Sequence, residues 1–212
     1  MWAMVDPTSE APRGPRPRPW PRHGSEPGLD LILFRQRWDS LENPRTGERM
    51  RRLVLETKSW VNVVAVDGRG RLVMVEQYRF GTERVTTEVP GGVIDAGEEP
   101  LAAARRELRE ETGYTSERWT YLGAVEPNPA FQDNLCHHFL AEGVSCTHPQ
   151  ELDAGEDIRV VLLAPDAVRA AVAEGEIKHA LVLTALARVM DLRTNPLPPD
   201  SPDITPPSSR VP

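Results

Sequence analysis

The stretch "RRELREETG" (residues 105–113) decides how the chain is interpreted, because it places three carboxylates within five residues. They are Glu107, Glu110 and Glu111. In a helix, which turns about 100° per residue, all three fall within one third of the circumference. Like charges one turn apart destabilise a helix by roughly a few tenths of a kcal/mol per pair. Either arginine partners on a solvated face or a bound cation would have to offset that repulsion.

The flanking residues predict that this helix runs over 100–112. Pro100 suits the first helical position, and Gly113 suits the residue after the last turn. Leu101, Ala104 and Leu108 fall on a separate apolar stripe that can face a core. The helix is therefore expected to be anchored by one face and to present its carboxylates on another.

The segment before the helix, "EVPGGVIDAGEEP", changes the interpretation of the carboxylates. Gly91 and Gly92 stand at the end of a predicted strand, and Gly97 directly precedes Glu98. Glycine allows the backbone to approach a ligand closely. A backbone carbonyl at this turn could join the carboxylates in an all-oxygen set, which Mg²⁺ or Mn²⁺ prefers. No histidine or cysteine lies in the cluster, so the pattern disfavours zinc.

The rest of the chain predicts a mixed α/β architecture with α/β/α layering. "LILFRQRW" and "RRLVLETKSW" flank the turn "NPRTGE" and predict an N-terminal antiparallel hairpin over 31–57. Further strands are predicted at 61–67, 71–79, 85–92, 119–125, 136–144 and 158–164, and further helices at 165–173 and 178–192.

Prolines mark both ends of the chain. Of 21 prolines, seven lie in residues 1–28 and seven in 194–212, so both segments are predicted to be disordered tails. The folded domain is then 29–193, and its first part, 29–57, holds the hairpin. The arginine and proline run near the start could contact an anionic surface, although a solvated tail is the simpler interpretation.

Charge and composition narrow the possible partners. The formal net charge of −7 argues against a non-specific nucleic-acid binder, which would normally present a basic face. No apolar run reaches the roughly 18 residues that span a bilayer. The two cysteines, Cys136 and Cys146, form no CxxC pair, and the start lacks the apolar core of a secretory signal. The expectation is a cytoplasmic protein that binds neither membrane nor nucleic acid.

The spacing of these residues resembles the Nudix box. The matching run is Gly92, five residues, Glu98, seven residues, then Arg106-Glu107-Leu108-x-Glu110-Glu111-x-Gly113-Tyr114. With its flanking strands, the resemblance covers roughly residues 30–192. It implies the Nudix α/β/α sandwich with a mixed sheet, and hydrolysis of a nucleoside diphosphate linked to another group with Mg²⁺ or Mn²⁺.

The resemblance also implies roles for individual residues. Glu107 and Glu111 match the family's main metal ligands, and Glu110 matches a further ligand or one that acts through water. The Gly91 carbonyl corresponds in position to the backbone ligand. Together they would neutralise the diphosphate and activate a bound water.

Two further pieces of the catalytic machinery are expected around the box. Arg106 would pair with Glu98 and hold the loop against the helix. A glutamate on a later loop often serves as the base in this branch of the family, and Glu156 is favoured, with an ordinary acidic turn as the alternative. The other acidic candidates on that loop are Glu151, Asp153 and Asp157.

Substrate assignment depends on residues outside the box. "VEQYRFGTERVTTEVPGG" and "EDIRVVLL" resemble the branch of ADP-ribose pyrophosphatases and nucleotide-sugar hydrolases. Arg79 could grip phosphate, because its guanidinium suits bidentate contacts, or it could form a salt bridge with Glu88. Glu88 itself could touch ribose or metal.

Other candidates for substrate contact are aromatic or amide side chains. Trp38 and Trp60 could stack on a nucleobase, although core or interface packing is at least as good an interpretation. Asn128 and Phe131 lie in "EPNPAFQDNLCHHFLAEG", which resembles nucleotide-sugar hydrolases more than ADP-ribose enzymes. The adjacent histidines in the same stretch, His137 and His138, point to opposite faces of a strand, so at most one lines the site.

The sequence therefore predicts a metal-dependent hydrolase of ADP-ribose or a nucleoside diphosphate sugar, and leaves three alternatives. One is hydrolysis of a dinucleoside polyphosphate or an mRNA cap, and another is a different nucleoside diphosphate derivative. The third is a non-catalytic nucleotide sensor, which an intact box disfavours. In this branch the N-terminal hairpin often crosses to a second subunit, so a homodimer is expected.

Overall fold

A computed structural model describes residues 16–193, which form two compact units that divide after Glu56. The two units are described separately. The predicted tails are largely outside the described residues, since 1–15 and 194–212 are not among them. Within 16–193, no helix is long and apolar enough to cross a membrane.

The first unit is an antiparallel sheet in the order β1-β2-β3. Its strands are β1 (Arg22–Asp30), β2 (Arg35–Glu42) and β3 (Arg49–Glu56). The hairpin predicted over 31–57 is confirmed, because β2 and β3 pair in continuous register from Arg35–Glu56 to Glu42–Arg49.

The first strand corrects the predicted extent of the N-terminal tail. Residues 22–28, which the sequence placed in a disordered segment, belong to β1. Every residue of β1 is exposed, so the strand is held by its pairing with β2 and by side-chain contacts rather than by apolar burial. Ser25 donates to Asp39, and His23 lies 2.9 Å from a Glu42 oxygen. Composition alone could not reveal a strand stabilised in this way.

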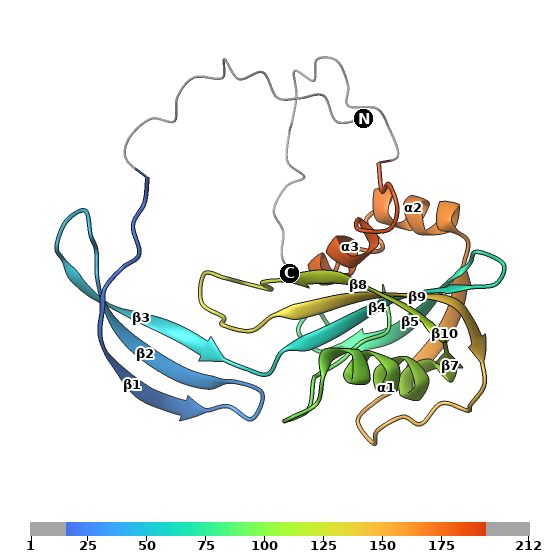
Figure 1. The fold of residues 1–212 in the computed structure, drawn as a ribbon, viewed down its shortest axis with the longest axis horizontal. Helices are drawn as coiled ribbons and strands as arrows, with labels where there is room; N and C mark the ends of the chain where they lie inside the picture. The colour runs from blue at the N-terminus through green and yellow to red at the C-terminus, as the bar shows by residue number, and fades with distance from the viewer. Residues whose placement is uncertain (1–15, 194–212) are drawn as a thin grey trace, which may run out of the picture. The chain divides into compact units, whose positions relative to one another are not determined.

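The second unit is built on a seven-stranded sheet (Figure 1). The central path is β10-β5-β4-β9-β7, while β6 pairs with β5 and β8 with β9. β4 and β9 run parallel and the other pairs are antiparallel, so the sheet is mixed, as predicted. The strands are β4 (Trp60–Asp67), β5 (Leu72–Arg79), β6 (Arg84–Glu88), β7 (Tyr114–Thr115), β8 (Arg118–Val125), β9 (Cys136–Cys146) and β10 (Ile158–Leu163).

Three helices cover the two faces of this sheet. Figure 1 shows α1 (Pro100–Thr112) on one face, and α2 (Pro165–Ala173) and α3 (Ala180–Leu186) on the other. Each face has its own apolar core, so the α/β/α sandwich is confirmed. The helix predicted over 178–192 is shorter than expected, because after Leu186 the backbone continues in turns that include i→i−3 hydrogen bonds.

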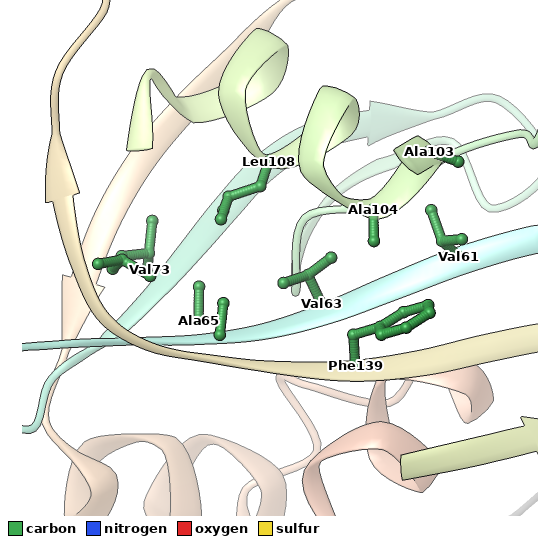
Figure 2. Packing of buried hydrophobic residues seen from close by; sticks show 10 residues of the cluster. Val61, Val63, Ala65, Val73, Ala103, Ala104, Leu108 and Phe139 are labelled. Atoms are coloured by element: carbon green, nitrogen blue, oxygen red, sulfur yellow. The ribbon is translucent and has the colours of Figure 1, made fainter. Parts of the chain in front are cut away.

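The core under α1 fixes the helix that carries the carboxylates. Ala103, Ala104 and Leu108 are fully buried against Val63 of β4 and Phe139 of β9, as Figure 2 shows. Burying a leucine side chain contributes about 1.5–3 kcal/mol. The apolar stripe predicted for this helix is therefore confirmed, and it sets the direction in which the opposite residues point.

Both predicted ends of α1 are confirmed. Pro100 occupies the first turn, where its missing N–H costs nothing. Gly113 adopts a left-handed φ of 74° and its N–H donates to the Arg109 carbonyl. A side chain at this position would be strained, and its Cβ would lie 2.1 Å from the His148 carbonyl oxygen.

Candidate active site

Two carboxylates of α1 are buried one helical turn apart. The exposed fraction is 9% for Glu107 and 4% for Glu111, whereas Glu110 is half-buried. Carboxylates are rarely buried this deeply unless they are paired or bind a ligand. The structure therefore separates the three carboxylates predicted to act together into a buried pair and a more exposed neighbour.

The glycine turn before α1 packs directly on this pair. The Gly91 N–H donates to Glu111 Oε2 at 2.8 Å. A Cβ at Gly92 would lie 2.4 Å from Glu107 Oε1, and a Cβ at Gly91 would lie 2.1 Å from the Val61 carbonyl oxygen. A side chain at Gly91 would meet fixed backbone, whereas one at Gly92 would have to displace the Glu107 carboxylate, so the backbone approaches the buried pair closely at this turn. Approach of the turn to a ligand stays a prediction. The contact shown is through the Gly91 N–H, and the role expected for its carbonyl stays a prediction.

Arg106 ties the loop to the helix. Its guanidinium donates to both oxygens of Glu98, each at 3.0 Å, and to the Val93 carbonyl at 3.0 Å. It also donates to Glu107 at 2.8 Å and to Glu110 at 3.2 Å. The pairing of Arg106 with Glu98 expected from the sequence is present, and these carboxylates hold the pKa of Arg106 above its usual value.

The buried pair is poorly neutralised in spite of Arg106. Burial raises the pKa of Glu111 to about 8, against the hydrogen bond from Gly91, and the charges of Glu107 and Glu156 add to the rise. Burial also raises the pKa of Glu107, although Arg106 opposes it. Removing a carboxylate from water disfavours its charged form, so this site favours added positive charge.

The donor set fits a divalent cation, although the side chains are not gathered around one point. Within residues 16–193, no three His, Cys, Asp or Glu side chains are grouped so that they could hold a metal ion. The reason is visible in the contacts, because Arg106 draws Glu110 and Glu107 to itself while Gly91 holds Glu111. Oxygen donors at an under-neutralised, glycine-lined turn are what a hard cation requires.

The loop between β9 and β10 brings one acidic candidate near the pair. The charge of Glu156 raises the pKa of both Glu107 and Glu111, so it lies within electrostatic reach of them. Glu151 is instead engaged with Arg109, at 3.2 Å. Among the acidic residues of this loop, Glu156 is therefore the one whose charge acts on both carboxylates, and its role as the base stays a prediction.

Arg79 and Glu88 form the salt bridge that the sequence left as one of two interpretations. Arg79 donates from Nε and Nη2 to the two oxygens of Glu88, each at 2.8 Å. Thr86 donates to Oε1 at 2.6 Å, and His179 Nδ1 lies 3.0 Å from Oε2. Burial opposes ionisation, yet these hydrogen bonds hold the pKa of Glu88 well below its usual value.

The remaining substrate candidates are spread over several elements. Trp38 belongs to the first unit, where the Arg51 guanidinium lies 4.9 Å from its ring centroid. Trp60 begins β4, and its backbone N–H donates to the Leu135 backbone carbonyl. The Asn128 backbone carbonyl accepts from the Phe131 backbone N–H, and 41% of Phe131 is exposed. Contact of these four residues with substrate stays a prediction.

The histidine pair occupies two different environments, as alternation along a strand requires. His138 is fully buried, and neither ring nitrogen has a hydrogen-bond partner among the described residues. His137 lies 3.0 Å from the Tyr121 hydroxyl. Cys136 is a buried core residue, and burial raises the pKa of its thiol to about 12.

Two polar residues near the site were not anticipated. His179 reaches Glu88 across 91 positions of sequence, and the Gln150 side chain donates to the Glu111 carbonyl at 2.6 Å. Neither residue lies in a motif, and long-range pairing of this kind leaves no periodic signal in a single sequence. Both contacts are consequences of the tertiary fold.

Comparison with known proteins agrees with this geometry. The chain is similar over 149 residues to the ADP-ribose pyrophosphatase of Bacillus subtilis, at 36% identity, covering 70% of this chain and 74% of the relative. It is 38% identical over 113 residues to the ADP-ribose pyrophosphatase of Mycobacterium tuberculosis, covering 53% and 54% of the two chains. A crystal structure of an ADP compounds hydrolase superposes with a TM-score of 0.73 at 22% identity, covering 83% of this chain and 95% of the other, which shows the same fold.

A model of the NUDIX domain matches residues 56–185 of the chain. This range holds the glycine turn, α1 and the loop that carries Glu156. The match covers more than half of the chain and starts at the residue where the first structural unit ends. The chain therefore belongs to the Nudix family, as the spacing from Gly92 to Tyr114 predicts.

Proposed function

We propose that the protein hydrolyses the diphosphate linkage of ADP-ribose or of a nucleoside diphosphate sugar, giving a nucleoside monophosphate and a sugar phosphate. The observation that carries the proposal is the pair of buried carboxylates, Glu107 and Glu111, packed against the backbone of the Gly91-Gly92 turn. The relatives named ADP-ribose pyrophosphatase favour this substrate class over the alternatives.

A divalent cation, Mg²⁺ or Mn²⁺, would be held by Glu107 and Glu111, with Glu110 and the Gly91 carbonyl as further donors. When bound, it would neutralise diphosphate oxygens and lower the pKa of a coordinated water. The protein's own residues would do the rest. Arg106 keeps the turn closed through Glu98, and Glu156 would accept the proton of the attacking water.

Arg79 would contribute positive charge where the diphosphate binds. The positive charge of Arg79 lowers the pKa of Glu111, so the two side chains are within electrostatic reach of each other. Glu88 holds the Arg79 guanidinium through Nε and Nη2. A guanidinium fixed in this way is already oriented before substrate arrives, which reduces the entropy lost on binding.

The test is a hydrolysis panel with Mg²⁺ and with Mn²⁺. The substrates are ADP-ribose, ADP-glucose, GDP-mannose, UDP-glucose, NADH and Ap4A, with products resolved by ion-exchange chromatography. Turnover of ADP-ribose or a nucleotide sugar to the monophosphate and sugar phosphate is expected. Hydrolysis of Ap4A alone would favour the polyphosphate alternative, and binding without turnover of any member would favour a sensor.

The first unit supports the expected homodimer. The end of β1 and the turn after it expose four apolar residues, Leu29 in the strand and Leu31, Ile32 and Leu33 in the turn, of which Ile32 is 98% exposed. Exposed apolar clusters mark interaction surfaces, and the partner proposed here is a second copy of the same sheet. Light scattering at micromolar concentration is expected to give a dimer for the wild type and a shift to monomer for Ile32→Asp. A monomeric wild type would contradict the assignment.

A further inference from the structure

The loop that carries Glu156 is fastened to the C-terminal end of α1. The last carbonyl oxygens of a helix have no hydrogen-bond donor inside the helix, and here the loop supplies the donors. Backbone N–H groups of Thr147 and His148 donate to the Gly113 carbonyl at 2.9 and 3.1 Å. The Glu151 N–H donates to the Glu110 carbonyl at 2.9 Å.

Gln150 makes the one side-chain contact in this set that joins three elements. Its Nε2 donates to the Glu111 carbonyl at 2.6 Å and to the Ile158 carbonyl at 3.3 Å. Glu111 lies in the last turn of α1, and Ile158 is the first residue of β10. One amide group therefore links the helix of the buried carboxylates, the loop and the strand that follows it.

The two hydrogen bonds of Gln150 also close the base of the segment that holds Glu156. Residues 151–157 lie between Gln150 and Ile158, so their two ends are held together by the amide. Inside the segment, the Glu156 carboxylate accepts from the Asp153 N–H at 3.0 Å, and the Glu156 N–H donates to the Asp153 carbonyl at 3.0 Å. Glu156 therefore sits in a small turn whose position depends on how that base is anchored.

We propose that Gln150 is a positioning residue, which fixes the Glu156 loop to α1 and so sets the spacing between the base and the carboxylates Glu107 and Glu111. This rests on the proposed function, since it gives Gln150 its role in the same reaction. The Gln150 amide donates to the peptide carbonyl of Glu111 and to the base of the loop, so it acts on the reaction through the placement of the loop. A misplacement of about 1 Å can cost roughly 10²-fold in rate, so a single amide can matter for turnover.

A simpler role as a helix cap predicts a different outcome. Loss of a cap would lower stability and leave the chemistry of folded molecules unchanged. A positioning role predicts a loss in kcat that depends on Glu156 being present. A double-mutant cycle separates the two, because residues that act as a unit are strongly non-additive.

The experiment compares the full chain with Gln150→Ala, Glu156→Gln and the double variant, on the substrate that the panel identifies. Gln150→Ala is expected to lower kcat about tenfold and to change KM by less than about twofold. In the Glu156→Gln background the same change should lower kcat by less than about twofold. Equal losses in both backgrounds, or a change confined to KM, would overturn the proposal.

Two further variants control for the loop and for the amide. Gln150→Glu keeps the size of the side chain but cannot donate, so it should match Gln150→Ala. His148→Ala removes a neighbouring side chain whose hydrogen bond is with Thr147 and not with α1, so it should retain wild-type kcat. A Gln150→Glu variant as active as the wild type would overturn the proposal.

Amide hydrogen exchange gives a readout that does not depend on turnover. Exchange across residues 147–158 should speed up in Gln150→Ala and stay unchanged in His148→Ala, and equal protection in Gln150→Ala and wild type would overturn the anchoring. A wild type that turns over no substrate would overturn the proposed function, and the positioning role with it. An active wild type with additive losses would overturn the positioning role alone.

Discussion

Glu88 and Glu111 are buried to nearly the same degree, at 3% and 4% exposed, yet the protein treats their charges in opposite ways. Glu88 has four contacts, two from Arg79 and one each from Thr86 and His179, and its pKa is held low. Among residues 16–193, the Glu111 carboxylate accepts one hydrogen bond, from the Gly91 N–H, and burial raises its pKa to about 8.

We infer from this difference that Glu88 is built for structure and Glu111 for binding a cation. A buried carboxylate with its own guanidinium is stable without any ligand, and Glu88 serves to hold Arg79 in place. A buried carboxylate with one neutral donor is left short of positive charge until a cation arrives. Three measurements can test this contrast between the charges of Glu88 and Glu111.

The largest expected effect is on turnover. Glu111→Gln keeps the acceptor for the Gly91 N–H but removes the charge, so kcat with Mg²⁺ should fall by roughly 10²–10³-fold or more. Without added metal the variant should be at least as stable as the wild type, because the buried group has become a neutral amide. Steady-state kinetics and thermal unfolding measure the two effects.

The wild type provides a further readout for this variant. Mg²⁺ or Mn²⁺ should raise its melting temperature by mass action, and the increase should be largely absent from Glu111→Gln. Glu117→Gln, at an exposed position, serves as the matched control and should behave as wild type in both assays. Unchanged turnover in Glu111→Gln would refute the assignment of this residue to the metal.

Glu88→Gln should give the opposite pattern, with stability lost first. Removing the charge leaves Arg79 without its carboxylate, and each hydrogen bond to a charged group is worth about 1.5–3 kcal/mol. Because the Arg79 side chain is 45% exposed and water can replace part of the interaction, a loss of about 2–3 kcal/mol is expected. Urea unfolding of the metal-free protein measures it. Should Glu88→Gln be as stable as Glu111→Gln, the contrast between the two residues would not hold.

The sequence predicted the features of this comparison that depend on local spacing and missed one that depends on a long-range contact. Glu111 could be assigned because its role depends on spacing within a single turn-helix segment, from Gly92 to Gly113. The salt bridge of Arg79 with Glu88 was one of two interpretations that the sequence left open, and the structure shows the two residues on paired strands. The contact of His179 with Glu88 was not predicted, because His179 approaches from the start of α3.

The same distinction between local and long-range information applies to the fold. Six strands of the central sheet follow from periodicity, and both ends of α1 follow from Pro100 and Gly113, whereas the two-residue strand β7 was not predicted. β1 was missed because its residues are all exposed and carry no apolar alternation. The pairing that stabilises β1 is with β2, and a single sequence does not encode such a partner as a local pattern.

The smallest expected effect concerns His138, a buried side chain whose ring nitrogens have no hydrogen-bond partner among residues 16–193. If burial without a charged partner favours the neutral form of Glu111 and raises its pKa, burial should also favour the neutral form of His138. For histidine the neutral form is the deprotonated one, so its pKa should fall. Burial lowers the pKa of His138 from 6.5 to about 4, and the charges of Arg188 and His137 add to the shift. Between these values the unfolded chain binds a proton that the folded protein excludes. Stability should therefore be complete above about pH 6.5 and decline as pH falls towards 4.

The decline can be measured by urea unfolding at pH 7 and pH 5. Between these two values, the wild type should lose about 1–2 kcal/mol more than His138→Gln, whose side chain cannot take up a proton. His148→Gln, in an exposed loop position, should follow the wild type. Parallel losses in the wild type and His138→Gln would mean that His138 has a partner, such as a buried water, that stabilises its charged form. Burial alone would then be an insufficient account of Glu111 as well, since the two residues are explained by the same cost of removing charge from water.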